Sequence, residues 1–279
     1  MAIMNVFEAL IMGLVQGLTE FLPVSSSGHL VIFGQILNLQ IDDGNAFSVL
    51  LHVATFISVC FVYYKDIIEL IKEFFLMIGD LFRGRPNFNR PYRRMLIMLI
   101  IATIPAVIVG LLFKMFDLDA MLSNLLVVGF MLLVTATLMY IVDKCNKNRY
   151  DASNAKYGSS LMVGLAQACA LMPGLSRSGS TITAARALGY KKEFAIKFSF
   201  LMSLPAILGA AVLEGVGLIK DGGFAVEALP LIVGFVAAAI SGILAIKFLI
   251  NLLNKNKFYI FSIYCGIVGL ICIIFSFVR

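Results

Sequence analysis

Long apolar runs alternate with short polar loops along most of the chain. Six of these runs are long enough to cross roughly 30 Å of hydrocarbon as helices. They lie at about residues 46–64, 95–116, 121–142, 194–216, 228–250 and 258–278. The pattern predicts an all-α integral membrane protein with six transmembrane helices.

Two further segments, about 3–38 and 159–190, are apolar but interrupted by polar residues, so neither contains an unbroken run of spanning length. Non-helical backbone at membrane depth is tolerated only where protein buries it or where it lines a wet cavity. Each segment is therefore predicted to be a re-entrant helix hairpin whose break points to a site. A third segment, about 65–82, carries its apolar residues on one helical face, which predicts an interfacial helix.

Composition and charge agree with a membrane protein. The 279 residues are 61% hydrophobic and 14% charged, and the mean hydropathy of +0.98 excludes an ordinary soluble domain. Basic residues cluster within 65–94, 144–156 and 255–257, whereas the loops 117–120 and 217–227 are mainly acidic. The positive-inside rule then places the basic loops in the cytoplasm and the C-terminus outside. The net charge of +6 is explained first by this topology and only secondarily by an anionic substrate.

An internal repeat relates the two halves of the chain. Residues 13–54 align without a gap with residues 164–205, at a constant offset of 151. Chance alignment of small residues in membrane sequence is an alternative, and the segments 104–110 and 204–210 resemble each other at a different offset.

We interpret the chain as a single membrane domain, 1–279, built from a first repeat over 1–150 and a second over 151–279. Each repeat would hold one hairpin followed by three crossings. Because that number of crossings is odd, the second repeat is inverted relative to the first. The first hairpin would then enter from outside and the second from the cytoplasm, with their tips meeting near the midplane.

The residues at the two breaks suit a phosphate group. The first break reads QGLTEFLPVSSSGHL (16–30) and the second reads QACALMPGLSRSGST (167–181). Together they supply the carboxylate of Glu20, the imidazole of His29, the guanidinium of Arg177 and several hydroxyls. A proline in each stretch ends one helix, and the serines and glycines that follow begin another. Helix N-termini bind anions through their free N–H groups and the positive end of the helix dipole.

Individual roles follow from residue chemistry. Arg177 offers a bidentate fork to phosphate oxygens. Gln16 and Glu20, four residues apart on one helix face, could hold a divalent cation such as Mg²⁺ or Ca²⁺. His29 is suited to general acid or base work near neutral pH, and the adjacent serines offer a nucleophile. Further phosphate contacts are expected from Ser25, Ser27, Gly28, Ser176, Ser178 and Thr181.

The paired stretches QGLTEFLPVSSSGHL and PGLSRSGST, in a six-crossing chain of this length, resemble the undecaprenyl-diphosphatase family, the BacA-type bacitracin-resistance proteins. The resemblance covers essentially the whole chain. It implies hydrolysis of undecaprenyl pyrophosphate to undecaprenyl phosphate and inorganic phosphate, with a divalent cation as cofactor. The site would open toward the outer face of the bacterial plasma (inner) membrane. The reaction would recycle the lipid carrier of cell-wall glycan synthesis and confer bacitracin resistance.

Position by position, Glu20, Ser26, His29 and Arg177 match the catalytic set of that family. The family motif has Glu or Gln at the position of Gln16 and Glu at the position of Glu20, so this chain has one anionic metal ligand fewer than members with two glutamates. Two mechanisms stay open: attack by Ser26 with His29 as base, or attack by water activated by His29 and the metal.

The inverted repeat and the broken helices also allow other functions. An inverted repeat with broken helices is also the usual build of secondary transporters, so a transporter or flippase of polyprenyl phosphate is the alternative. A helper subunit with a vestigial site is a third reading. The expected partners are the polyprenyl diphosphate and bilayer lipids, with a homodimer left open and no nucleic acid. Outside the tips, His52 is expected to be a hydrogen-bonded core residue, and Arg186 to extend toward an interface.

Overall fold

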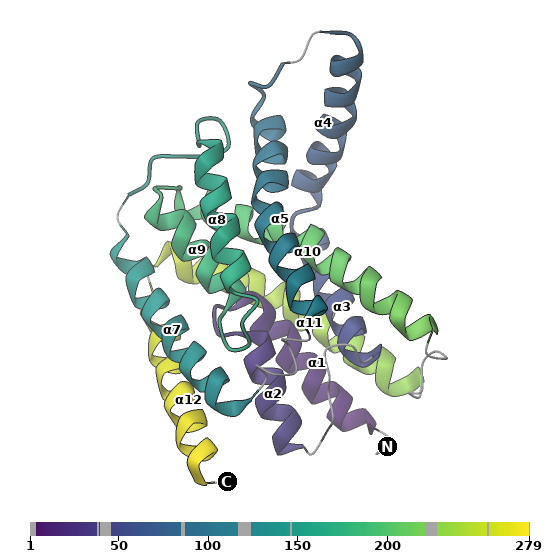
Figure 1. Ribbon diagram of the computed structural model, residues 1–279, viewed down its shortest axis with the longest axis vertical. Helices are drawn as coiled ribbons and strands as arrows, with labels where there is room; N and C mark the ends of the chain where they lie inside the picture. Colours follow the sequence, from purple (N-terminus) through teal and green to yellow (C-terminus); the bar gives the residue numbers. More distant parts are fainter. Residues whose placement is uncertain are drawn as a thin grey trace.

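The computed structural model describes residues 4–37, 39, 46–84, 87–116, 124–145, 147–220, 228–255 and 257–278 (Figure 1). These parts of the chain contain eleven helices and no strand. The helices are α1 (Val6–Phe21), α2 (Ser26–Ile36), α3 (Ala46–Val62), α4 (Tyr64–Phe82), α5 (Pro91–Met115), α7 (Leu125–Lys144), α8 (Tyr157–Cys169), α9 (Arg177–Ala187), α10 (Lys192–Lys220), α11 (Ala228–Asn254) and α12 (Tyr259–Val278). The predicted all-α class is confirmed.

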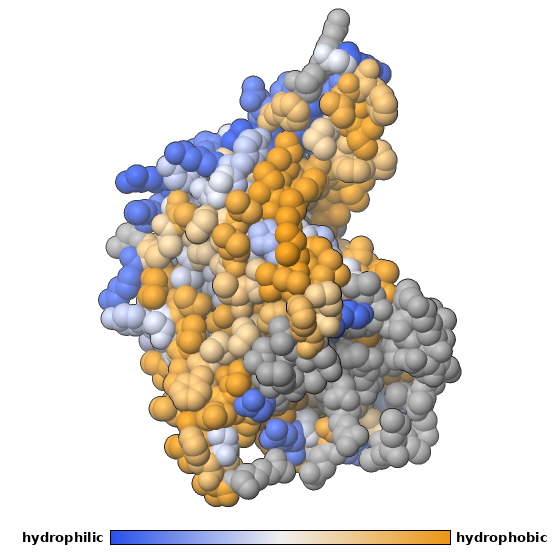
Figure 2. Space-filling view, in the orientation of Figure 1, coloured by the Kyte–Doolittle hydropathy of each residue, from blue (hydrophilic) through white to orange (hydrophobic). Residues whose placement is uncertain are grey.

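Within the described residues, five helices, α5, α7, α10, α11 and α12, are long and apolar enough to cross a membrane. Large apolar side chains cover much of the visible surface, and polar residues gather mainly along the upper left of the view, with smaller groups lower down (Figure 2). The protein is therefore a multi-pass membrane protein. The remaining predicted crossing corresponds to α3, a helix of 17 residues that rises about 25 Å at ~1.5 Å per residue. It meets α4 at an angle of 87°, so that these two together give a sixth candidate span.

Both polar-interrupted segments form pairs of short helices. In the first, α1 and α2 are joined at residues 22–25, and in the second, α8 and α9 are joined at residues 170–176. Each second helix begins with a serine cap: the Ser25 hydroxyl accepts the Gly28 N–H, and the Ser176 hydroxyl accepts the Gly179 N–H. The predicted breaks are thus present, and both lie in the proline-containing stretches.

Helices from the two halves of the chain pack against each other. α1 lies along α11, α8 lies along α5, and α7 lies along α12. The approach of α1 to α11 depends on small residues, since a Cβ at Gly17 would lie 2.1 Å from Ser241 Oγ and a Cβ at Gly13 would lie 2.3 Å from the Gly234 oxygen. This packing carries the ends of α1 and α8, and hence both breaks, into the middle of the molecule (Figure 1).

The predicted interfacial helix is α4, which packs against α5 in a hairpin beside the bundle (Figure 1). A buried ion-pair network joins the two helices. Arg93 Nε donates to Glu73 (3.0 Å), and Arg93 Nη1 donates both to Asp80 (2.7 Å) and to the Asn87 carbonyl (2.7 Å). Arg90 also donates to Glu73 (3.2 Å). The hydrophobic pattern does not predict this network, because the basic residues of 65–94 indicate topology and not a pairing between two helices.

Replacing Arg93 by methionine should lower the free energy of unfolding by about 3 kcal/mol, because it leaves the Glu73 carboxylate buried without its partner. The Arg93 side chain is 0% exposed. Thermal unfolding in detergent and hydrogen exchange of α4 measure the effect. The control is Lys72→Met, which removes a Lys72–Glu69 pair whose side chains are 60% and 44% exposed, so a change below about 0.5 kcal/mol is expected. Equal effects of the two variants would contradict a stabilising role for the network.

Candidate active site at the meeting of two hairpins

The breaks of the two hairpins touch each other and α7. Gly174, in the second break, has φ +90°, and a Cβ there would lie 2.6 Å from the Val128 carbonyl oxygen, so only glycine fits. A Cβ at Gly28, in α2, would lie 3.3 Å from the Gly174 Cα. Thr135 of α7 donates to the Gly174 carbonyl (3.2 Å) and accepts the Ser176 N–H (3.0 Å). The predicted meeting of the two polar stretches is therefore observed.

Glu20 is the centre of the site. Its Oε2 accepts a hydrogen bond from Ser26 Oγ (2.6 Å) and another from Gln16 Nε2 (3.1 Å). Its Oε1 accepts one from Arg177 Nη2 at 2.5 Å. Glu20 is buried and Arg177 is largely buried, so the pair is held in a low-dielectric setting where an uncompensated charge would be costly. The carboxylate thus joins Ser26, from the first hairpin, to Arg177, from the second.

Arg177 has hydrogen-bond donors that its bond to Glu20 does not use. Its Nη1 is buried and has no hydrogen-bond partner among the described residues. A guanidinium has five N–H donors in a planar fork, so Nη2 can remain on Glu20 while Nη1 binds an anion. Arg177 is also the first residue of α9, where the positive end of the helix dipole adds to its charge.

The hydroxyl groups repeat in the two hairpins. Ser25 and Ser27 share a hydrogen bond of 3.3 Å, and Ser176 and Ser178 share one of 3.2 Å. The backbone differs between the two caps, since Ser25 has φ 71° whereas Ser176 has φ −64°. A non-glycine residue with positive φ is strained, and such strain clusters at functional sites. It lies immediately before Ser26, in the repeat that also carries Glu20.

His29 lies near the site but does not contact Ser26. Its Nδ1–H donates to the Ser25 carbonyl (2.8 Å), and its Nε2 is paired with the Tyr264 hydroxyl (2.7 Å). The His29 and Tyr264 rings are stacked, with centroids 5.6 Å apart. The group beside the Ser26 hydroxyl is therefore Glu20, not the histidine that the sequence suggested. Tyr264 was missed because it lies on α12, far along the chain and in an ordinary apolar run.

Other predicted residues lie apart from this cluster. Thr181 Oγ1 bonds to Ser199 Oγ (2.6 Å) and to the Arg177 carbonyl (2.9 Å), so it fixes α9 to α10. Arg186 is not directed to an interface: it is buried and donates to the carbonyls of Cys145 and Tyr190. The earlier interpretation of Arg186 was wrong because the loop before α8 covers that side chain.

The second histidine, His52, is half-buried on α3 and bonds through Nδ1 to the Ser48 carbonyl (2.9 Å), as a hydrogen-bonded helix residue. Its helix, α3, packs against α1, the helix that carries Glu20. No motif surrounds His52 in the sequence, so only this packing places it near that helix.

The residues at Gln16 and Glu20 fit a hard cation. Gln16 is fully buried, and its Oε1 has no partner among the described residues, although its Nε2 bonds to Glu20. Within those same residues no group of three His, Cys, Asp or Glu side chains gathers as a metal centre. One carboxylate and one amide oxygen suit Mg²⁺ or Ca²⁺ that takes its other ligands from water and substrate phosphates.

Comparison with known proteins now adds to this geometry. The family model of the bacitracin resistance protein BacA matches residues 9–271, which include every site residue named above. The chain belongs to the BacA family. An undecaprenyl-diphosphatase of Methanobrevibacter smithii is 46% identical over 273 residues, 96% of each chain. Those of Alkaliphilus metalliredigens (46% over 275 residues) and Bacteroides fragilis (43% over 276 residues) each align with 98% of this chain and 99% of their own length. The BacA resemblance inferred from the two motifs is confirmed.

Proposed function

We propose that this protein is an undecaprenyl-diphosphate phosphatase that hydrolyses the lipid diphosphate to undecaprenyl phosphate and inorganic phosphate. Two relatives named undecaprenyl-diphosphatase align with this chain over 96% and 99% of their own length. The observation that carries the assignment is Glu20, which holds a hydroxyl nucleophile from one hairpin and a phosphate-binding guanidinium from the other. The reaction would return the lipid carrier to cell-wall synthesis and so confer bacitracin resistance.

We further propose an inverted repeat of two re-entrant hairpins, in a bacterial plasma membrane, with the site open to the outer face. The exchange of partners supports the repeat: α1 of the first half packs on α11 of the second, and α8 of the second packs on α5 of the first. The basic loops support the orientation. Because both tips come from one chain, we expect a monomer to be active, and the homodimer stays open.

The diphosphate would bind between the N-termini of α2 and α9. The first N–H groups of a helix have no partner within the helix, and the dipole there favours an anion. Arg177 Nη1 adds a charged donor. Ser25, Ser27, Ser176 and Ser178 hold these two helix starts in shape through their caps and paired hydroxyls.

Ser26 would attack the terminal phosphorus. As the Ser26 Oγ–P bond forms, the hydroxyl proton passes to Glu20 Oε2, which lies 2.6 Å away. The bridging P–O bond breaks, and undecaprenyl phosphate leaves with that oxygen. Glu20 gives its proton to the departing undecaprenyl phosphate. Water then attacks the phosphoserine, Glu20 accepts a proton from the water and returns it to Ser26 Oγ as the Oγ–P bond breaks, and inorganic phosphate and free Ser26 are produced. Arg177 stabilises the charge on the transferred phosphoryl group.

Gln16 and Glu20 would hold the divalent cation, which would neutralise phosphate charge when bound. His29, whose ring nitrogens bond to the Ser25 carbonyl and the Tyr264 hydroxyl, would fix the start of α2 against α12. With only one carboxylate for the cation, its affinity should depend on the substrate phosphates.

The deciding experiment measures phosphate release from undecaprenyl diphosphate by the purified protein in detergent, with and without a chelator. We expect release by wild type, a loss of about a hundredfold with the chelator, and recovery with Mg²⁺ or Ca²⁺. If phosphate release continued at the wild-type rate in the presence of the chelator, the reaction would not depend on a divalent cation. Binding of the lipid without any phosphate release would instead favour the transporter.

A further inference from the structure

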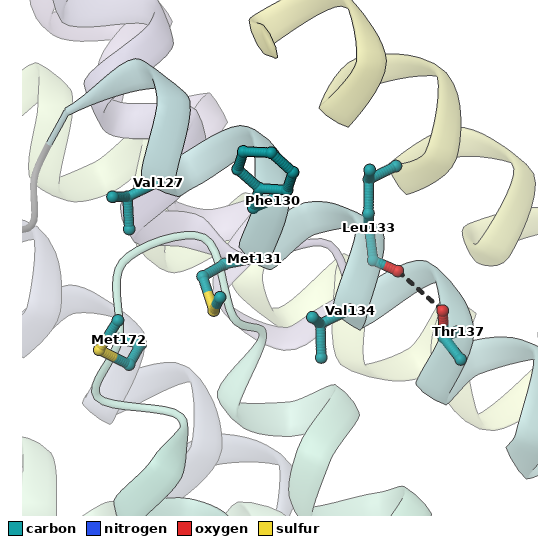
Figure 3. Close-up of a pocket in the computed structure, with 7 residues that line it drawn as sticks. All are labelled: Val127, Phe130, Met131, Leu133, Val134, Thr137 and Met172. Atoms are coloured by element: carbon teal, nitrogen blue, oxygen red, sulfur yellow. Dashed lines mark hydrogen bonds between the residues drawn. The ribbon is translucent and has the colours of Figure 1, made fainter.

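An apolar groove of about 600 Å³ runs along the outer face of α7, next to the second hairpin (Figure 3). Its lining includes Val127, Phe130, Met131, Val134 and Thr137 of α7, together with Met172 of the α8–α9 break. The side chain of Met172 closes one side of the groove, opposite Val127 and Met131 (Figure 3). Phe130 and Val134 are exposed, so the groove opens sideways from the protein.

Helix α7 lies between the groove and the phosphate site and contributes residues to both. Thr135, next to Val134, turns inward and bonds to the Gly174 carbonyl and the Ser176 N–H. Met172 belongs to the same short break as Gly174 and Ser176. One face of α7 therefore bonds to the α8–α9 break, which carries Ser176. The adjacent face of α7 lines the apolar groove, which leads away from that break.

A second apolar groove, of about 690 Å³, lies between α4, α5 and α10. It is equally free of charged residues, and its lining includes Val107, Ile104 and Leu201. It has no residue from either hairpin break. A ligand with one end at the breaks would meet Met172 at the wall of the α7 groove, whereas no residue of either break lines the second groove.

We propose that the α7 groove holds the isoprene units of the lipid substrate that lie nearest the diphosphate. This inference rests on the proposed phosphatase function, because a lipid diphosphate must have its tail leave the polar site by an apolar path. A groove of this size matches a small-molecule pocket, so it takes the first isoprene units while the rest of the chain lies in the bilayer.

The groove mainly determines which lipid tails the protein accepts. In a membrane the surrounding lipid is as apolar as the groove, so burial alone gives little free energy, and shape and van der Waals packing decide what binds. Branched, unsaturated isoprene units would be distinguished from straight acyl chains by the side chains of Met131, Val134 and Met172. Methionine side chains adapt readily to such irregular shapes.

The test narrows each groove by the same substitution. Val134→Trp fills the α7 groove, and Val107→Trp fills the second groove; the two valines are 42% and 48% exposed, respectively. For Val134→Trp we expect KM for undecaprenyl diphosphate to rise about tenfold, the range seen when an apolar pocket loses a methylene-sized fit. Its kcat and its Ki for inorganic pyrophosphate, which has no tail, should stay at the wild-type values. Val107→Trp should match wild type throughout.

Binding of undecaprenyl monophosphate to the same three proteins gives a readout that needs no catalysis. Weaker binding to Val134→Trp alone supports the groove even if wild type releases no phosphate, in which case only the phosphatase function fails. Equal KM and equal monophosphate binding for the two tryptophan variants would overturn the groove proposal. So would a parallel rise in the Ki for pyrophosphate, because it would mean that the substitution distorts the phosphate site.

Discussion

Replacing Ser26 by alanine is expected to lower the rate of phosphate release about ten-thousandfold. The Ser26 hydroxyl lies 2.6 Å from Glu20 Oε2 and opens helix α2, so it combines a base with the electrostatic field of a helix N-terminus. Catalytic residues that act as a unit have non-additive effects. Removing the nucleophile alone therefore lowers the rate almost as much as removing the nucleophile, the base and the binding groups together. Single-turnover phosphate release from undecaprenyl diphosphate measures the effect.

Ser27→Ala is the matched control. Ser27 is the next residue, is half-buried to a similar degree, and bonds to Ser25 Oγ rather than to Glu20. Its removal should cost tenfold or less, about the worth of one neutral hydrogen bond. A phosphoserine trapped by acid quench in wild type and absent in Ser26→Ala would identify the intermediate. If Ser26→Ala kept more than a tenth of the activity, water would be the nucleophile and Ser26 only a phosphate contact.

The sequence predicted the breaks, and the structure has them where Pro23 and Pro173 lie. Proline and glycine act on the local backbone, so their effect is readable without tertiary structure. The meeting of the tips was also predictable, because the repeat relates two polar stretches in an otherwise apolar chain. Their mutual contact through Gly28 and Gly174 follows that expectation.

Side-chain pairing inside the site was not predictable. His29 follows Ser26 by one helical turn, which suggested a serine–histidine pair, but its ring turns back to the Ser25 carbonyl. The partner of Ser26 comes from the preceding helix, and the turn at residues 22–25 that folds Glu20 over Ser26 depends on the strained φ of Ser25. Neither feature leaves a periodic pattern in the sequence.

The contacts that α7 and α12 make with the two hairpins could not be predicted from the sequence either. Thr135 and Tyr264 lie in long hydrophobic runs with no motif around them, and a threonine there most simply bonds to its own helix backbone. Instead, Thr135 binds the second break and Tyr264 binds His29. Only the packing of α7 and α12 beside the hairpins gives them these partners.

Replacing Arg177 by alanine is expected to lower kcat/KM about a thousandfold, the lower end of what a charge-stabilising arginine contributes to phosphoryl transfer. Both kcat and KM should change, because Arg177 would bind the ground-state phosphate and also the charge of the transition state. Arg177→Lys should recover only part of the loss: lysine keeps the positive charge but cannot bond to Glu20 and phosphate with a planar fork. Steady-state assays of the three proteins give the comparison.

Folding must be separated from catalysis, because Arg177 also pairs with the buried Glu20. Removing one partner of such a pair destabilises a protein by about 3–5 kcal/mol. Inorganic pyrophosphate provides the second readout: it should raise the thermal unfolding midpoint of wild type, raise that of Arg177→Lys less, and leave that of Arg177→Ala unchanged. If pyrophosphate stabilised Arg177→Ala as much as wild type, Arg177 would be a structural partner of Glu20, and the helix N-termini alone would bind the phosphate.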